Sequence, residues 1–367
     1  MKIYGIILAL LCPLHFIFAA EANFQNYLDE WRTQNQVTSV VVSTENLSTD
    51  KVVTYASGTT TLRGKTPVTT NSLYGVGSIS KTFVAATILQ LQEEDKLKLS
   101  DPLGDYLPQY PRWKSITLQQ VLNMTGGIPN FTESPKFKPM VRQNPQTLIP
   151  SQDFINIAYA MPDYFAPGQG WHYSNTDYSL LGLVIEKVTG QPLEAVFEQR
   201  FFKPLKLNHT FSSPEFYSKA VEAQMAHAYR EGQDVTNFNT GLYGPAGGMV
   251  MNSHDLLIWT HALLTPGIVL SQDSLNQLMT TVPVPPNPPK PAGAQYGLGI
   301  YSLDMKNLGT VWYYAGVIDG YTSTFMWIPA KNTIIVAQVA SWPNGHFEVL
   351  FPNQPLIQKV LSECCGS

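Results

Sequence analysis

The stretch GVGSISKTF, residues 75–83, places Ser78 and Lys81 three residues apart where a glycine-rich segment leads into a predicted helix. Residues i and i+3 lie on the same face of a helix, so the Lys81 amine can reach the Ser78 hydroxyl. A serine hydroxyl is a weak nucleophile near neutral pH, and it needs a positioned base. A lysine can be that base when burial or nearby positive charge lowers its pKa. The stretch therefore predicts a nucleophile and its base at a buried helix start.

The spacing alone is not specific, because Ser48 and Lys51 repeat it inside a polar turn. The surroundings separate the two pairs. Gly75 and Gly77 allow the backbone to approach closely, and the apolar residues after Lys81 favour a buried helix. The unpaired N–H groups at a helix start also favour negative charge that develops there.

The segment YSN, residues 173–175, contains side chains that the first pair lacks. A tyrosine near a lysine can relay a proton from a serine to a leaving group. Asn175 can hold a substrate amide through both its donor and its acceptor. The alternative for Tyr173 is an ordinary half-buried aromatic, the usual place of most of the 18 tyrosines.

The order of predicted elements favours an α+β fold, an antiparallel sheet flanked by helices with an inserted helical domain. We expect residues 23–85 and 266–367 to form the sheet-plus-helix domain and residues 86–265 the helical insertion. The strongest patterns are a hairpin at 37–57, helices at 81–95, 176–190, 253–264 and 354–363, and strands at 296–303, 310–316, 323–329 and 332–340. Asn175 or Thr176 is expected to cap the helix that Gly190 ends.

Composition narrows the function classes. The 367 residues are 44% hydrophobic and 14% charged, as in globular proteins, and the formal net charge is −4. No run of Lys or Arg stands out, so we expect no nucleic-acid partner and no anionic membrane surface.

Residues 1–22 are predicted to be a signal peptide. Lys2 is followed by an apolar run that ends in small residues, and cleavage is expected near Ala22. The alternative is an uncleaved anchor, since the run approaches the length that spans a bilayer. No later segment is apolar enough to span a membrane, which predicts a secreted or periplasmic protein.

Cysteine, metal and cofactor signals are sparse. Cleavage would remove Cys12 and leave the adjacent Cys364 and Cys365, which we expect to be free, vicinal or intermolecular rather than catalytic. The six later histidines are scattered, without a metal-ligand spacing, and neither a Gly-x-Ser-x-Gly elbow nor a phosphate-binding loop is present. No metal or other cofactor is implied.

Together these residues resemble the serine β-lactamase and penicillin-binding family, which includes class C β-lactamases, D-alanyl-D-alanine carboxypeptidases and related esterases. Residues 78–81 are similar to the nucleophile motif of that family, 173–175 to its second motif and YAGVIDGY at 314–321 to the strand of its third. Further similar stretches are LNMTGGIPNF (122–131), GPAGGMVMNSHDLLIW (244–259) and YGLGI (296–300). The resemblance spans roughly residues 25–345.

The resemblance implies a hydrolase that cleaves amide or ester bonds in a D-alanyl peptide, a β-lactam or an ester. Ser78 would be the acylated nucleophile, and Lys81 and Tyr173 the base and acid. Asn175 would contact the substrate amide. The oxyanion would lie between the N–H groups of Ser78 and about Val317, and Gly316 would let the substrate lie against the third-motif strand.

Tyr314 departs from the family pattern, which has Lys or His there, or Trp in some esterases. A neutral tyrosine brings no charge to pair with a substrate carboxylate. Another cation, Arg63, Arg142, Arg230 or His346, is an alternative. Two further readings stay open: a non-catalytic descendant that binds peptidoglycan fragments or a partner, and an esterase or acyltransferase without a peptide substrate.

Overall fold

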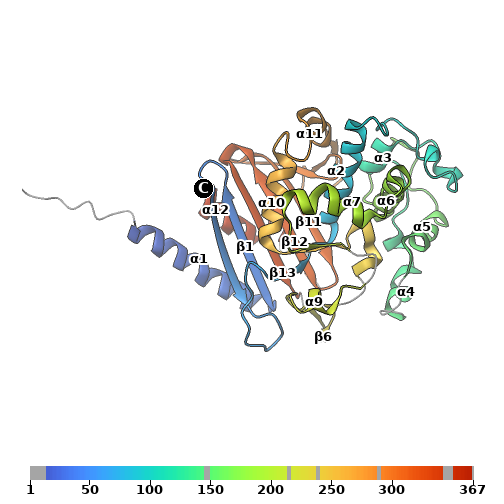
Figure 1. Ribbon diagram of the computed structural model, residues 1–367. Coiled ribbons are helices and arrows are strands. Elements are labelled where there is room, and N and C mark those ends of the chain that lie inside the picture. Colours follow the sequence, from blue (N-terminus) through green and yellow to red (C-terminus); the bar gives the residue numbers. More distant parts are fainter. Residues whose placement is uncertain are drawn as a thin grey trace, which may run out of the picture.

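An eight-stranded antiparallel sheet joins the two ends of the chain (Figure 1). The structure, a computed structural model, describes residues 14–143, 149–212, 216–236, 240–286, 291–341 and 350–365. The strand order is β2-β1-β13-β12-β11-β10-β9-β8. The bounds are β1 Ser39–Asn46, β2 Lys51–Gly58, β8 Val282–Pro283, β9 Gln295–Tyr296, β10 Tyr301–Met305, β11 Gly309–Ile318, β12 Tyr321–Ile328 and β13 Thr333–Ala340.

The sequence explains the central position of β13. Its residues TIIVAQVA are mostly β-branched or apolar, and all eight are buried. An uninterrupted apolar strand suits a sheet that is covered on both faces. β1 lies on one side in the register Ser39 to Ala340, and β12 lies on the other in the register Tyr321 to Ala340.

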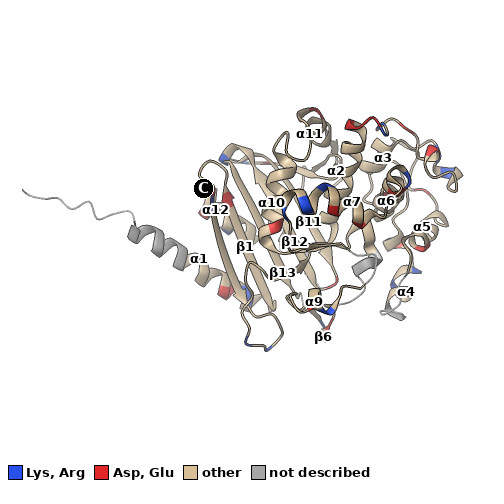
Figure 2. Ribbon diagram, in the orientation of Figure 1, with Lys and Arg blue, Asp and Glu red and all other residues tan. Residues whose placement is uncertain are grey.

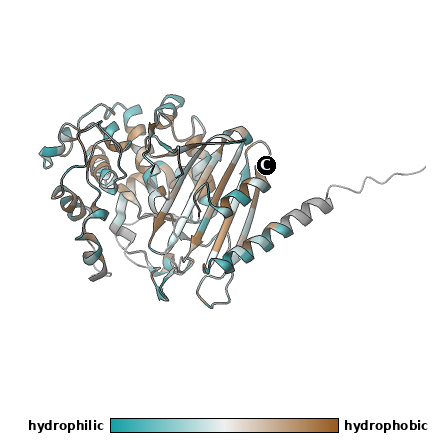
Figure 3. Ribbon diagram, turned by 180° about the vertical axis from the view of Figure 1, so that it is seen from behind, coloured by the Kyte–Doolittle hydropathy of each residue, from teal (hydrophilic) through white to brown (hydrophobic). Residues whose placement is uncertain are grey.

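Helices cover both faces of this sheet (Figures 1 and 3). α1 (Leu14–Gln34) and α12 (Pro355–Cys365) pack on one face, and α10 (Ser253–Leu264) packs across β1, β12 and β13 on the other. α2 (Ser80–Glu93) is tied to α10 because the Phe83 ring stacks on Trp259 at 3.6 Å. The Trp259 indole also donates to the Thr82 hydroxyl at 2.9 Å.

Beside α2 lies a helical region whose centre is α6 (Asn175–Thr189). α6 ends at Gly190, which has a left-handed φ of 68°. The other helices are α3 Leu118–Leu122, α4 Phe137–Gln143, α5 Ser151–Tyr159, α7 Leu193–Phe197, α8 Lys203–Leu205, α9 Lys219–Glu222 and α11 Gln272–Leu278. Short strands β3 Tyr74–Gly75, β4 Thr210–Phe211 and β7 Val250–Met251 form a second sheet, and β5 Tyr229–Arg230 pairs with β6 Gln233–Asp234.

The predicted fold class, the hairpin, the four helices and three of the four strands are confirmed. The strand expected at 296–303 is interrupted, because β9 ends at Tyr296, β10 begins at Tyr301 and Gly299 between them has a left-handed φ of 88°. One cap was wrong: Ser174 is the N-cap of α6, and the extended backbone there lets Asn175 begin the helix. The proposed domain limits stay a prediction. α2 runs through residues 85 and 86, and α10 packs on the sheet although it belongs to the middle of the chain.

The two ends of the chain bear on the expectations about export and cysteines. α1 includes the expected cleavage region near Ala22. Among the described residues, no helix is long and apolar enough to cross a membrane. Cys364 and Cys365 are free, with their sulfur atoms 3.2 Å apart. Charged side chains lie mainly on outer helices and loops, and most of the central strands carry none (Figure 2).

Candidate active site

Ser78 lies in a single 3₁₀ turn, η1 (Gly77–Ile79), that leads directly into α2. Gly77 is needed there for two reasons. Its φ of +49° is unfavourable for other residues, and a Cβ atom would lie 2.6 Å from the Val317 nitrogen. The turn is also held by the Ser80 hydroxyl, which donates to the Gly77 carbonyl at 2.8 Å. Ser78 is thereby fixed against β11, with its side chain partly exposed.

Lys81 is completely buried one helical turn after Ser78. Its Nζ atom lies 3.0 Å from Ser78 Oγ, 2.8 Å from Asn175 Oδ1 and 2.5 Å from the Ala246 carbonyl oxygen. The last two oxygens can only accept hydrogen bonds. A neutral amine would use both of its N–H groups on them, which leaves its lone pair directed at Ser78.

Burial lowers the pKa of the Lys81 amine well below its usual value, and the carboxyl of Asp177 opposes this shift. Asp177 is equally buried, and burial raises its pKa well above the usual value, against the effects of Ser174 and Lys81. Its Oδ1 atom has no hydrogen-bond partner among the described residues. Burial thus favours the uncharged form of each group, whereas the attraction between their charges opposes both shifts.

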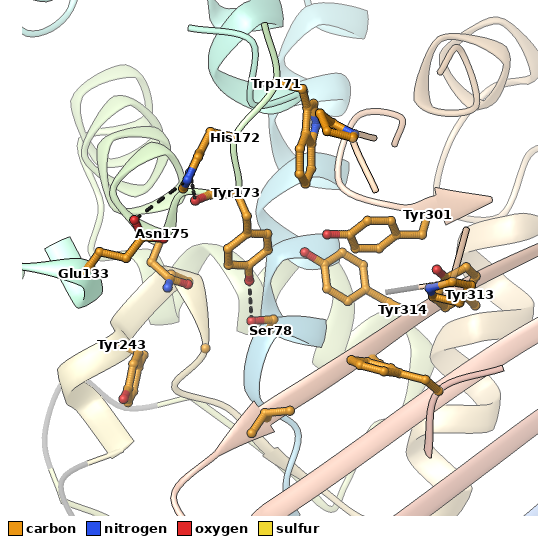
Figure 4. A pocket seen from close by; sticks show the side chains of 17 residues that line it. Ser78, Glu133, Trp171, His172, Tyr173, Asn175, Tyr243, Tyr301, Tyr313 and Tyr314 are labelled. Carbon is orange, nitrogen blue, oxygen red and sulfur yellow. Dashed lines mark hydrogen bonds and ion pairs between the residues drawn. The ribbon is translucent and has the colours of Figure 1, made fainter. Parts of the chain in front are cut away.

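Tyr173 completes a cluster of three groups around the serine oxygen. Its hydroxyl lies 2.6 Å from Ser78 Oγ, and the Lys81 Nζ atom lies 5.0 Å from the centre of its ring (Figure 4). Burial raises the pKa of Tyr173 to about 12, although hydrogen bonds with Ser78 and Tyr314 oppose the rise. Tyr173 therefore holds its proton at neutral pH and can give it away.

The start of α6 positions Asn175. The Thr176 hydroxyl donates to the Pro129 carbonyl at 2.6 Å and accepts from the Phe131 amide at 3.1 Å, which fixes a neighbouring loop. From that loop, Asn130 Oδ1 accepts from the Asn175 side-chain amide at 3.3 Å. Asn175 thus orients Lys81 through its oxygen. A role in holding a substrate amide stays a prediction, for which one N–H of its side chain remains.

Gly316 has a packing role beside the turn that leads to Ser78. A Cβ atom there would lie 1.9 Å from the Val76 carbonyl oxygen and 2.8 Å from the Ser78 nitrogen. The glycine therefore makes room for the segment before the nucleophile, because that is where its missing side chain would point. Its expected role, letting a substrate lie against the strand, stays a prediction.

Val317 lines the same cavity as Ser78. β10 pairs with β11 only as far as Tyr313, so residues 314–318 have a strand neighbour on one side alone. The turn that carries Ser78 lies against this stretch. The position suits two backbone N–H groups, of Ser78 and Val317, converging on an oxyanion.

A cavity of about 430 Å³ opens above Ser78 (Figure 4). One wall carries aromatic side chains, and the other carries Glu133, His172 and Asn175. Among the described lining residues there is no Lys or Arg, and Glu133 is the one carboxylate. The complete lining is Ser78, Glu133, Trp171, His172, Tyr173, Asn175, Tyr243, Ala246, Gly247, Pro285, Pro291, Tyr301, Tyr313, Tyr314, Ala315, Val317 and Phe351.

Tyr314 is completely buried, and its hydroxyl lies 3.2 Å from that of Tyr296. Of the cations named as alternatives, the two whose side chains the structure describes do not line the cavity. Arg63 is exposed elsewhere, and Arg230 forms an ion pair with Asp319 at 3.0 Å. His346 and the side chain of Arg142 fall outside the described residues.

The sequence reasoning missed three contributors to this site. Asp177 has the pattern of a helix N-terminal charge, and its place in the first turn of α6 gave no sign of burial beside a lysine. The Ala246 carbonyl is a backbone group, so the residue type gave no signal, although the sequence around it, GPAGG, is one of the stretches similar to the family. Glu133 lies in a 3₁₀ turn (Phe131–Glu133), where one acidic residue has no distinctive neighbours.

The arrangement can carry out acyl transfer without a metal. Ser78 Oγ lies within hydrogen-bond distance of both the Lys81 amine and the Tyr173 hydroxyl, and Ser78 and Val317 both line the cavity. No cluster of three or more metal-ligating side chains occurs in the described part of the chain.

Comparison with known sequences finds similarity to β-lactamases over most of the chain. Residues 24–356 match the family described as Beta-lactamase. The β-lactamase of Escherichia coli (strain K12) is 31% identical over 216 residues, which is 58% of this chain and 53% of that protein. The chain spans 64%, 53% and 32% of the length of three curated relatives from Bacillus subtilis and Escherichia coli.

Solved structures cover more of the chain. A D-stereospecific amidohydrolase from Streptomyces sp. is 30% identical, with a TM-score of 0.78 over 94% of this chain and 99% of that one. A D-amino acid amidase from Ochrobactrum anthropi SV3, complexed with L-phenylalanine, has a TM-score of 0.80 at 21% identity over 93% and 96% of the two chains. At 21% identity, the similarity to the D-amino acid amidase is one of fold alone.

Proposed function

Because the chain belongs to the β-lactamase family of serine hydrolases, we propose that it is a serine amidohydrolase that works through an acyl-enzyme on Ser78. The observation that carries the proposal is the meeting of Lys81 Nζ and the Tyr173 hydroxyl at Ser78 Oγ, at 3.0 and 2.6 Å. A positioned base and acid on one oxygen are what an activated serine needs.

The reaction begins when Ser78 Oγ attacks the substrate carbonyl carbon and its proton passes to Lys81. The carbonyl oxygen becomes an oxyanion held by the N–H groups of Ser78 and Val317, and such a donor typically contributes about 3 kcal/mol to transition-state stabilisation. The bond to the leaving nitrogen then breaks as Tyr173 gives that nitrogen a proton. Lys81 returns the proton of Ser78 to Tyr173, and water releases the acyl group by the same route.

The charges of the cavity narrow the substrate class. Glu133 Oε2 accepts from the Tyr164 hydroxyl at 2.6 Å and lies 3.8 Å from His172 Nε2. A carboxylate attracts a substrate ammonium group and repels a carboxylate. We propose an amide whose acyl part carries a free amino group, as in an amino-acid amide, rather than a D-alanyl peptide with a carboxylate end. The 30% identical D-stereospecific amidohydrolase supports this choice.

Intact-protein mass spectrometry tests the proposal. The protein is incubated with a fluorophosphonate, with a penicillin and with D-phenylalaninamide, each beside the Ser78→Ala variant. We expect a fluorophosphonate adduct on Ser78 and release of ammonia from the amide, both lost in Ser78→Ala, with a slow penicillin adduct or none. Labelling that persists in Ser78→Ala would overturn the assignment of the nucleophile.

Two alternatives give different results in the same assay. A non-catalytic binding descendant would form no adduct with either reagent. An esterase would be labelled by the fluorophosphonate and would cleave esters without releasing ammonia from the amide. The export of the protein is likewise a proposal, which rests on residues 1–22. N-terminal sequencing of the protein recovered after expression tests it by showing whether the chain starts near Asn23.

A further inference from the structure

Behind Tyr173, three buried tyrosines form a line of hydroxyl groups that ends on the backbone. The hydroxyl of Tyr314 lies 3.2 Å from that of Tyr296, which lies 3.3 Å from that of Tyr178. The Tyr178 hydroxyl donates to the Leu122 carbonyl at 2.8 Å. All three side chains are completely buried. At the other end of the line, the hydroxyl of Tyr314 is directed toward Tyr173 (Figure 4).

The proton count fixes how these hydroxyls point at rest. Each has one proton, and a carbonyl oxygen can only accept, so the proton of Tyr178 is taken up by Leu122. Tyr296 must then donate to Tyr178, and Tyr314 must donate to Tyr296. No proton of this line is directed at Tyr173 at rest, and the Tyr173 proton is left for Ser78.

The count changes when Tyr173 gives its proton to a leaving group. Its oxygen then accepts only and carries negative charge in a buried place, where an unpaired charge is costly. A rotation of one O–H bond turns the Tyr314 proton from Tyr296 to Tyr173, and a second rotation lets Tyr296 follow.

We propose that Tyr314 is a positioning residue for Tyr173, a switchable hydrogen-bond donor that holds the phenolate oxygen formed during acyl transfer. The inference rests on the proposed function, whose acid step it deepens. It also assigns Tyr314 to the reaction instead of to a substrate carboxylate.

Two observations favour this role over substrate contact. The Tyr314 side chain is completely covered, and Figure 4 shows its hydroxyl end directed toward Tyr173. A hydroxyl also suits the site electrically, because a buried cation would carry a desolvation penalty that a neutral donor avoids.

The test compares two leaving groups on one acyl part, in D-phenylalaninamide and the p-nitrophenyl ester of D-phenylalanine. The amide nitrogen must be protonated to leave, whereas p-nitrophenolate leaves without a proton. In Tyr314→Phe we expect kcat/KM to fall about 10- to 100-fold for the amide, as for the loss of a hydrogen bond to a charged group, and less than about threefold for the ester. Tyr296→Phe should show the same pattern more weakly.

Tyr74→Phe is the matched control, since it removes a buried hydroxyl that donates to Ser39 at 3.0 Å, outside the cavity lining. Thermal melting checks that each variant folds. If Tyr314→Phe does not fold, the comparison of amide and ester in Tyr296→Phe decides the test alone. Equal losses for amide and ester would overturn the inference while fluorophosphonate labelling of Ser78 upheld the proposed function. No labelling of the unmodified protein would overturn both.

Discussion

The amine of Lys81 donates a hydrogen bond to the side-chain oxygen of Asn175 across 2.8 Å, which joins the helix of the nucleophile to the start of α6. This contact, together with the Ala246 carbonyl, uses two hydrogen atoms of the amine. It therefore makes the charge of Lys81 decisive, since a third hydrogen would occupy the lone pair that faces Ser78.

The pH dependence should report this charge directly. The pKa of Lys81 is lowered, so the amine is protonated only at pH values below that depressed pKa. We expect kcat/KM to rise with pH along a limb centred well below the ordinary lysine value of 10.5, and to fall again only near the Tyr173 pKa of about 12. Stopped-flow rates across the pH range measure both limbs.

Lys81→Arg is the companion variant, because arginine keeps its charge throughout this range. It should lose at least about 10³-fold in kcat at every pH. An acid limb centred at the ordinary lysine value would contradict a neutral base.

Asp177→Asn should move the acid limb to lower pH. The Asp177 carboxyl raises the Lys81 pKa, and the amide removes that influence while keeping the shape. A shift of the limb to higher pH, or none, would show that Asp177 exerts no such influence.

Stability gives a second measurement on the same variant. The folded-state pKa of Asp177 is raised above 3.8, so the carboxyl contributes stability below that value and loses it as pH rises toward the folded-state pKa. Urea unfolding should show that the free energy of unfolding of Asp177→Asn, relative to the unmodified protein, increases over this rise.

Glu133→Gln tests the selection of substrates with a free amino group. We expect KM for D-phenylalaninamide to rise about three- to tenfold, modestly because the side chain is 47% exposed, with little change in kcat. The N-acetylated amide should be unaffected. Glu30→Gln, on the exposed face of α1, is the control, and equal effects on both substrates would rule out pairing with an ammonium group.

Gly316→Ala should disturb the site through the backbone alone. The added methyl would collide with the Val76 carbonyl oxygen, which we expect to destabilise the protein by about 1–3 kcal/mol and to slow labelling of Ser78. Gly267→Ala is the control for destabilisation away from the site, since its φ of +83° strains the backbone while nothing lies within 4 Å of its added Cβ atom. Normal labelling of Gly316→Ala would show that the turn before Ser78 can move aside.

The sequence predicted the parts of the site that depend on local order. Ser78, Lys81 and Tyr173 were found because a helix start and a tight turn hold their motifs, and the structure brings them together. The anomaly at Tyr314 was also visible. Its role was not, because the partner hydroxyls of Tyr296 and Tyr178 come from distant segments that only the fold assembles.

The remaining misses have physical causes of the same kind. Burial decides what Asp177 does, and burial is a property of the packed molecule rather than of the first turn of a helix. The direction of a missing side chain decides what Gly316 does, and it became clear only once Val76 was seen beside it.

The pairing of β1 with β13 has a consequence for how the protein folds during its synthesis. The first strand of the sheet pairs with β2, which follows it in the chain, and with the last strand, so one of its two partners is synthesised long after it. A nascent chain already contains Ser78 and Lys81 yet lacks β11, whose Val317 must lie against the nucleophile. The proposed site therefore stays incomplete until β11 has been synthesised, and a chain that stops before Thr333 leaves one edge of β1 unpaired, which favours aggregation.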